Sequence, residues 1–181
     1  MWEAVSRNMP VCLYRPGNIG HHSRTGAANS NDFQTMIIDA CKKVKCAPKA
    51  DHWSFEITPI DFFTKAMVAF SENAAHYGQV YNVVRNDPVP AHIVFDLMMD
   101  AGLITDFVSI DEWKSRLLKK AEDENIRILN VLAQSLDDFE LYLNGSPRCD
   151  CSGFERALAT HDLQRPTIGS EYFMKLLRPA D

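Results

Sequence analysis

The sequence of 181 residues has no long hydrophobic run, and this absence argues against two classes of protein. No stretch of about eighteen apolar residues is free of charge, as a membrane-spanning helix would require. The first ~30 residues contain no basic region followed by an apolar stretch, as a secretory signal would. With 46% hydrophobic and 24% charged residues, the composition predicts a globular cytoplasmic protein of one compact domain, or a large piece of one.

An excess of positive charge is also absent. The 19 Lys and Arg residues are outnumbered by 24 Asp and Glu residues, which gives a formal charge of -5 without any long basic run. This balance argues against nucleic acid and anionic membranes as partners and leaves small ligands and proteins. The 5 cysteines are an odd number spread along the chain, which favours a reducing compartment over a disulfide framework.

Several catalytic motifs are missing as well. No tyrosine is followed by lysine at the fourth position, so the Tyr-x-x-x-Lys pair of short-chain oxidoreductases is not present. No Gly-x-Ser-x-Gly nucleophile elbow occurs either. Gly17 and Gly20 begin a glycine-rich turn, but Ser23 stands where a dinucleotide-binding loop would place its third glycine. The sequence therefore offers no catalytic residue of its own.

Cysteine and histidine pairs give only weak metal-binding patterns. Cys149 and Cys151 with His161 lack a fourth ligand at a suitable spacing, so a pair of loop thiols is the simpler interpretation and no metal site is predicted. The neighbouring His21 and His22 offer a general base or metal ligands, but adjacent side chains usually diverge. A role in lining a substrate, or simple solvation, is favoured for them.

The hydrophobic pattern predicts an α/β first half and a mostly helical second half. Apolar runs at 11–14, 54–57 and 79–84 are typical of strands, and three-to-four-residue spacing predicts helices from Asp32 to Val44 and after Thr58, with Thr58 as N-cap and Pro59 at the first helical position. Beyond Pro90 we expect one short strand at 104–110 among helices at 93–101, 111 onwards, 125–143, 154–158 and 172–177.

Two further features bear on organisation. The segment 17–31 is polar and rich in glycine, which predicts a loop long enough to carry function. Residues 2–8 resemble the last turns of a helix without an N-cap, which predicts a chain cut from a longer one. Arg15 and Asp61 are charges beside apolar runs, and because buried charges are rarely left single, our hypothesis is that they form an ion pair.

These segments together resemble a known family. The motifs are Arg15-Pro-Gly-Asn-Ile-Gly-His-His-Ser-Arg-Thr-Gly-Ala27, Asn31-Asp-Phe33, Ile57-Thr-Pro-Ile-Asp-Phe62, Val80-Tyr-Asn-Val83, Asn86-Asp-Pro-Val-Pro90 and Asp111-Glu-Trp113. In this order they resemble the C-terminal half of a thioester reductase domain, as found in nonribosomal peptide synthetases, aminoadipate reductases and carboxylic acid reductases. These domains belong to the extended short-chain dehydrogenase/reductase group.

The resemblance implies a fold, an activity and partners. It implies the C-terminal part of a Rossmann-like domain, with a mostly helical substrate-binding subdomain. It also implies a reductase that uses NADPH to release an acyl or peptidyl chain, as aldehyde or alcohol, from the phosphopantetheine thioester of a carrier protein. We accordingly expect residues 1–90 to be the Rossmann-like portion, with a substrate loop at 17–31, and residues 91–181 to be the helical subdomain.

The resemblance also implies which residues form the site. The nicotinamide would be lined by the turn Pro16, Gly17, Asn18 and Ile19, and the acyl-phosphopantetheine arm would enter along His21, His22, Ser23, Arg24 and Thr25. A polar backbone turn suits a carboxamide that needs nearby hydrogen-bonding groups. The family's glycine-rich loop and Tyr-x-x-x-Lys pair belong to an N-terminal half that does not match here. We therefore expect the chain to be inactive alone, and a non-catalytic module that binds acyl carrier protein is the alternative.

Overall fold

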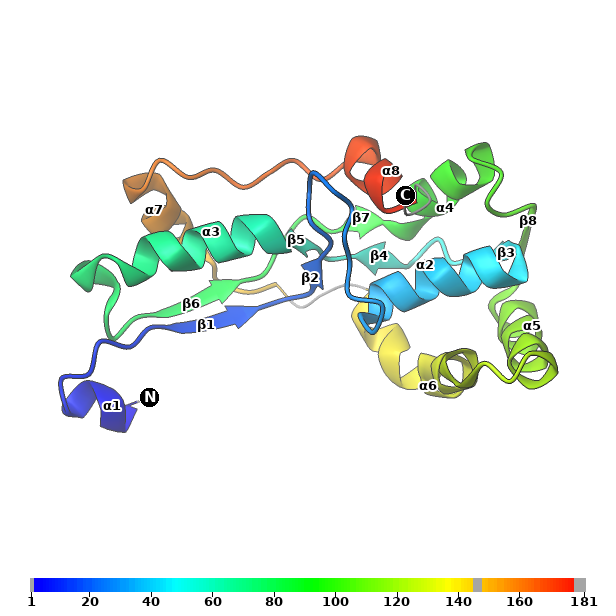
Figure 1. The fold of residues 1–181 in the computed structure, drawn as a ribbon, viewed down its shortest axis with the longest axis horizontal. Coiled ribbons are helices and arrows are strands. Elements are labelled where there is room, and N and C mark those ends of the chain that lie inside the picture. Colours follow the sequence, from blue (N-terminus) through cyan, green and yellow to red (C-terminus); the bar gives the residue numbers. More distant parts are fainter. Residues whose placement is uncertain (1, 145–147, 178–181) are drawn as a thin grey trace.

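The computed structural model describes residues 2–144 and 148–177 as an elongated α/β molecule (Figure 1). Its helices are α1 (Trp2–Ser6), α2 (Phe33–Val44), α3 (Ile60–Ser71), the 3-10 helix η1 (Ala74–His76), α4 (Ala91–Asp100), α5 (Ile110–Asp123), α6 (Arg127–Leu143), α7 (Ser152–Thr160) and α8 (Ser170–Leu177). Its strands are β1 (Leu13–Pro16), β2 (Ile19–Gly20), β3 (Cys46–Pro48), β4 (Ser54–Phe55), β5 (Thr58–Pro59), β6 (Val80–Val83), β7 (Val89–Pro90) and β8 (Asp106–Val108).

The strands form pairs between segments that are distant in the sequence. Strand β1 lies parallel to β6, with Tyr14 opposite Tyr81, and β2 lies parallel to β5. Strand β3 is parallel to β8, whereas β4 and β7 are antiparallel. Parallel pairs need a crossover connection, commonly a helix, and α3 supplies part of the connection between β1 and β6. The expected α/β character and the helix-rich second half are confirmed.

One hydrophobic core surrounds α2. The helix begins where the Asp32 carboxylate accepts hydrogen bonds from the backbone N–H and the hydroxyl of Thr35, and it ends at Lys45 in the left-handed conformation. Its buried residues Ile37 and Cys41 pack in a cluster that also contains Trp113 of α5. Helices α4, α6 and α8 contribute to the same cluster, at the end of the molecule that holds α5 and α6 in Figure 1.

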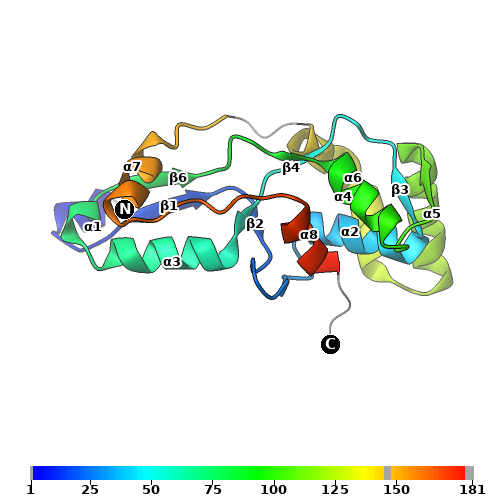
Figure 2. The same ribbon diagram turned by 90° about the horizontal axis from the view of Figure 1, so that it is seen from above.

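A second, smaller core lies at the other end of the molecule. Phe70 of α3 and Phe154 of α7 both contact Tyr81 of β6, with ring centroids 5.3 and 6.2 Å from the tyrosine ring. Figure 2 shows β1, β6, α3 and α7 gathered at this end. Each core draws on residues from both sides of residue 90, since α2 joins the first and α7 the second. The expected division of the chain into two domains at residue 90 stays a prediction.

The start of α3 differs from the sequence-based expectation. Helix α3 begins at Ile60 without a side-chain cap, because the Thr58 hydroxyl donates to the backbone oxygen of Val83 at 3.2 Å. The prediction of Thr58 as N-cap is therefore wrong. Within residues 2–144 and 148–177, no helix is long and apolar enough to cross a membrane.

Candidate functional site

A pocket of 420 Å³ lies at the carboxyl ends of the parallel strands β1 and β6. Ligands of open α/β sheets commonly bind in this position. We call it the Glu56 pocket, and its walls come from the turn after β1, the first turn of α2, the end of α6 and the segment after β6. The lining residues are Pro16, Gly17, Asn18, Phe33, Gln34, Glu56, Val84, Tyr142, Leu143 and Cys149.

Glu56 is the buried acid at the base of this arrangement. Its side chain is only 4% exposed, and its carboxylate accepts hydrogen bonds from the backbone N–H groups of Asn18 and Arg85, at 2.5 and 2.7 Å. Burial raises the pKa of Glu56, while the two N–H groups and the nearby guanidinium groups oppose that rise. One carboxylate thus fixes the segments that follow β1 and β6.

The predicted cofactor turn is shaped by this carboxylate. A Cβ atom at position 17 would collide with the carboxylate of Glu56, so any larger residue there would have to displace this hydrogen-bonded group. The backbone oxygen of Asn18 accepts a hydrogen bond from the N–H of Thr58 at 2.9 Å. Pro16, Gly17 and Asn18 line the pocket, whereas Ile19 pairs with Thr58 in the β2–β5 ladder, and binding of a cofactor by this turn stays a prediction.

His21, the first residue of the predicted substrate segment, is buried against α8. Its ring stacks on Tyr172 with centroids 3.6 Å apart, and its Nε2 lies 2.9 Å from the backbone oxygen of Tyr172. The Tyr172 hydroxyl in turn donates to the backbone oxygen of His21 at 2.9 Å. Burial lowers the pKa of His21, which favours the neutral imidazole. The ring thus packs against Tyr172 and anchors the loop.

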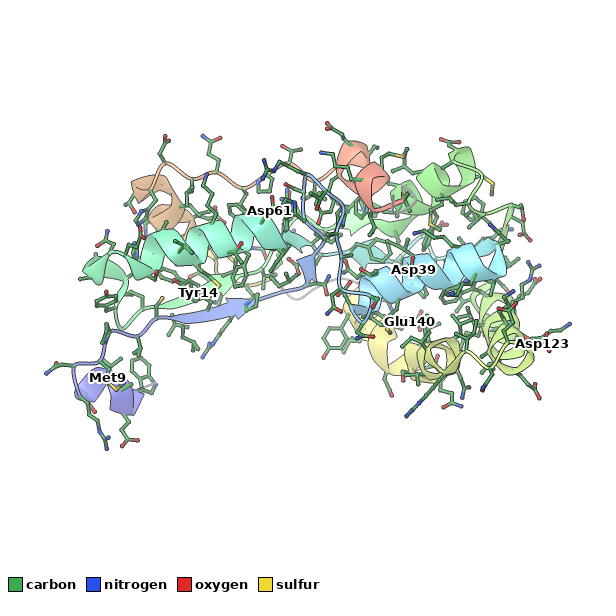
Figure 3. The ribbon with its side chains drawn as sticks, viewed as in Figure 1. Met9, Tyr14, Asp39, Asp61, Asp123 and Glu140 are labelled. Carbon is green, nitrogen blue, oxygen red and sulfur yellow. The ribbon has the colours of Figure 1, made fainter. Side chains whose placement is uncertain are left out.

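Ser23 ties the same loop to α3. Its backbone N–H and its hydroxyl donate to the two oxygens of Asp61, at 2.8 and 2.6 Å. Burial alone would raise the pKa of Asp61, but these two hydrogen bonds lower it overall. Asp61 lies at the start of α3 beside the loop (Figure 3), and Arg15 is exposed. The hypothesis of an Arg15–Asp61 ion pair is therefore wrong, since Ser23 is the partner of the carboxylate.

The rest of the loop continues along α8. Lys175 donates to the backbone oxygen of Ser23 at 3.0 Å, and Gly26 adopts a φ of +73 where a Cβ would collide with the Lys175 backbone oxygen. Arg24 and Thr25 are exposed, with their N–H groups 3.2 and 3.4 Å from Nδ1 of His22. The loop is thus held on both sides, and its exposed residues are Arg24 and Thr25 together with positions 27–31.

Of the predicted substrate residues, only His22 lines one of the cavities described for this chain, and it is not the Glu56 pocket that Pro16, Gly17 and Asn18 line. His22 and Asp61 belong to an open groove of 560 Å³ along α3, which shares no lining residue with the Glu56 pocket. The sequence indicated the turn and the loop as segments of interest but did not show where they lie relative to each other. It also missed Glu56 and Gln34. The signal for Glu56 was an acid between Phe55 and Ile57, because a charge in an apolar strand must find buried partners.

The cysteines and His161 are used in separate contacts. The Cys151 thiol donates to the backbone oxygen of Val84 at 3.2 Å, whereas His161 lies 2.8 Å from His76 between their Nε2 atoms. Over the described ranges, no three His, Cys, Asp or Glu side chains are grouped so as to hold a metal ion.

The fold and the pocket at the strand ends define an α/β domain of the Rossmann-like class, and comparison with known proteins identifies its relatives. A family model described as "Male sterility protein", of the NAD-binding type, matches residues 1–67. The non-canonical nonribosomal peptide synthetase FrzA of Cladobotryum sp is 28% identical over 186 residues, which is 96% of this chain and 18% of that protein. The glycine betaine reductase ATRR of Emericella nidulans is 34% identical over 61% of this chain and 9% of its own length.

A solved structure of a reductase domain is similar to nearly the whole chain. The terminal R domain from the myxalamid PKS-NRPS pathway superposes with a TM-score of 0.78 at 28% identity, covering 97% of this chain and 45% of that one. The chain thus corresponds to the C-terminal part of a terminal reductase domain of the nonribosomal peptide synthetase type, as the motifs indicated. The extended short-chain dehydrogenase/reductase fold is confirmed as well. The chain spans less than a fifth of the curated relatives and less than half of the R domain.

Proposed function

We propose that this chain is part of an NADPH-dependent thioester reductase, which releases an acyl or peptidyl chain from a carrier protein as aldehyde or alcohol. The observation that carries the proposal is the Glu56 pocket, built from the turn Pro16–Asn18 at the ends of parallel strands. The chain that builds it is similar to a terminal R domain. A nicotinamide cofactor is in keeping with the family model that matches residues 1–67.

The residues of the pocket fit a nicotinamide. Gly17 lets the backbone lie directly against the Glu56 carboxylate, and this carboxylate holds the turn at the wall of the pocket through the N–H of Asn18. Phe33 and Leu143 supply apolar surface in a pocket of 420 Å³, which is in the size range of small-molecule sites. When bound, the cofactor supplies the hydride that reduces the thioester carbonyl. The contribution of this chain is to bind and orient the ring.

The loop residues His21, His22, Ser23, Arg24 and Thr25 are proposed to guide the phosphopantetheine arm. His21 and Ser23 set the course of the loop through Tyr172 and Asp61, while Arg24 and Thr25 are exposed and available to an incoming carrier protein. Residues 91–181 are proposed as the carrier-facing subdomain. The alternative, a non-catalytic module that binds acyl carrier protein, is favoured by one observation, the absence of a Tyr-x-x-x-Lys pair from this sequence.

The test joins this chain to the part of the myxalamid R domain that precedes the matched region. We expect the hybrid to oxidise NADPH when given an acyl-carrier thioester, and the chain alone to show no turnover. The matched control is the hybrid with the tyrosine of the added Tyr-x-x-x-Lys pair changed to phenylalanine. A hybrid that binds NADPH and acyl carrier but reduces nothing would favour the binding module. Turnover by the chain alone would contradict the claim that its catalytic groups lie elsewhere.

A further inference from the structure

A groove of 240 Å³ lies between α2 and α6, and it shares no lining residue with the Glu56 pocket. In Figure 1, α2 lies above α6 at the end of the molecule that also holds α5, and the two helices contact each other there. Residues of both helices form the walls. They are Met36, Ala40 and Lys43 of α2 and Ile128, Leu129 and Leu132 of α6.

Several apolar side chains at this groove remain open to solvent. Ile128 is 39% exposed, and Val131, one turn further along α6, is 42% exposed. Met36 of α2 is only partly buried, whereas Leu129 and Leu132 of α6 are buried in the larger core. Helix α6 therefore has a second apolar strip beside the one that packs against the core. Apolar side chains gathered at one groove, unlike single scattered ones, indicate a surface that a partner covers.

The charge at the rim of the groove specifies the chemistry of that partner. Lys43 and Arg127 are both exposed, and neither forms an ion pair with another residue that the structure describes. Arg127 directly precedes Ile128 and lies one turn before Val131 on α6. Asp39 is the acidic residue of the lining, but its carboxylate already contacts Nζ of Lys42 at 3.0 Å. Two unpaired cations beside a neutralised acid favour a partner that carries carboxylates, although the chain as a whole has a formal charge of -5.

The groove adjoins the segments that the proposed function uses. Ser30 and Asn31, at the end of the predicted substrate loop, line the groove, whereas 16–18 at its beginning line the Glu56 pocket. Helix α2 also contributes to both, since Phe33 lines the pocket and Met36, one turn later, lines the groove. A protein seated in the groove would thus lie beside the loop and the first turn of α2 that lead to the pocket.

We propose that the groove between α2 and α6 docks the carrier protein, through a helix that presents acidic side chains around an apolar residue. A hollow between two packed helices suits the side-chain ridge of a third helix. The apolar residue lies on Ile128 and Val131, and the carboxylates face Lys43 and Arg127. This inference rests on the proposed function, which supplies the carrier protein as the partner. It adds α2, which precedes residue 90, to the surface that faces the carrier.

The first experiment measures binding of this chain to the carrier domain of the FrzA synthetase by isothermal titration calorimetry. We expect saturable binding that weakens at high salt, because the proposed contact includes exposed opposite charges. NMR of the ¹⁵N-labelled chain should show shifts at the exposed faces of α2 and α6. No saturable binding to the folded chain would overturn the inference, and so would binding whose shifts lie elsewhere.

Variants assign the binding to the groove. The double charge reversal of Lys43→Glu with Arg127→Glu should weaken carrier binding about tenfold and reduce its dependence on salt. Ile128→Gln should also weaken binding, because it removes apolar contact surface. The control is Arg156→Glu, a charge reversal at an exposed position of α7, at the other end of the molecule in Figure 1. A thermal melt of each variant shows whether it is folded.

The outcome of the reversal decides between occupants of the groove. Equal affinity of the native chain and the folded double variant for the carrier would overturn the inference. Sedimentation of the chain alone tests a second copy as the occupant. Dimers that the double reversal dissociates, with carrier binding unaffected, would overturn carrier docking in favour of self-association.

The hybrid separates this inference from the reductase proposal. In the hybrid, the double reversal should raise the KM for an acyl thioester on the carrier domain about tenfold with little change in kcat. It should leave the KM for the same acyl chain on free pantetheine unchanged, because that substrate has no protein to dock. An active hybrid in which neither KM changes, or in which both rise equally, would overturn docking and leave the reductase proposal standing. An inactive hybrid whose isolated chain still loses carrier binding on charge reversal would count against the reductase alone.

Discussion

Replacement of Glu56 by glutamine tests the buried carboxylate that organises the pocket. In the native chain its two oxygens accept the N–H groups of Asn18 and Arg85. Glutamine keeps one acceptor and turns its NH2 group toward the other N–H, which leaves a buried donor unpaired at a cost of about 1–3 kcal/mol. For a chain of this size that corresponds to a fall in Tm of roughly 3–9 °C. Glu122→Gln, at an exposed position of α5, is the matched control.

The pH dependence of the same variant gives a second check. Because the pKa of Glu56 is raised in the folded chain, the stability it contributes is full below its unfolded pKa and falls as the pH rises through the folded pKa. Glutamine does not titrate, so the destabilisation caused by Glu56→Gln should be larger near pH 4 than near pH 7. Urea unfolding at both pH values measures the difference. An unchanged Tm, or destabilisation that grows from pH 4 to pH 7, would refute the reasoning.

Three further changes probe the turn, the loop and the second core. Gly17→Ala places a Cβ against the buried carboxylate and should destabilise the chain by about 1–3 kcal/mol in urea unfolding, so wild-type stability would contradict the close approach. Asp61→Asn weakens the hydrogen bonds to Ser23 and should speed hydrogen exchange of the Ser23 amide, so equal exchange rates in both proteins would exclude this role. Because the pKa of Asp61 is lowered in the folded chain, its contribution to stability is present above the unfolded pKa and is lost as the pH falls through the folded pKa. His76→Phe removes the imidazole beside His161. Because burial and His161 lower the pKa of His76, its contribution to stability is present above the unfolded pKa and is lost as the pH falls through the folded pKa. The variant should therefore lose less stability than the wild type between about pH 7 and pH 5, and parallel curves of stability against pH would count against a lowered pKa of His76.

Part of the site could be predicted from the sequence because it is encoded locally. The sequence Pro16-Gly17-Asn18 marks a turn after a strand, and the structure places this turn at the Glu56 pocket. The partners of the turn could not be predicted in the same way. Glu56 lies just after β4 and Gln34 in the first turn of α2, and their local patterns say nothing of where the two residues meet.

Single residues show how tertiary contacts override local preference. Thr58 before Pro59 has the local pattern of an N-cap, yet its hydroxyl donates to the oxygen of Val83 in a neighbouring strand. Arg15 and Asp61 had opposite charges beside apolar segments, but Ser23 reaches the carboxylate instead. In both cases the partner chosen depends on geometry that only the packed chain supplies.

The sequence by itself determined the longer helices and the strands β1 and β6, because hydrophobic period acts over a few neighbouring residues, whereas the two- and three-residue strands β2, β3, β5 and β7 leave no such pattern. The helix that starts near Asp32 and the strand around Val80–Val83 were both expected from the hydrophobic pattern. The tertiary structure decided which loop residues are fixed and which are exposed. His21 meets Tyr172 across 151 positions of sequence. No local pattern encodes such a contact, because it forms only when strand pairing and the two cores bring α8 onto the loop.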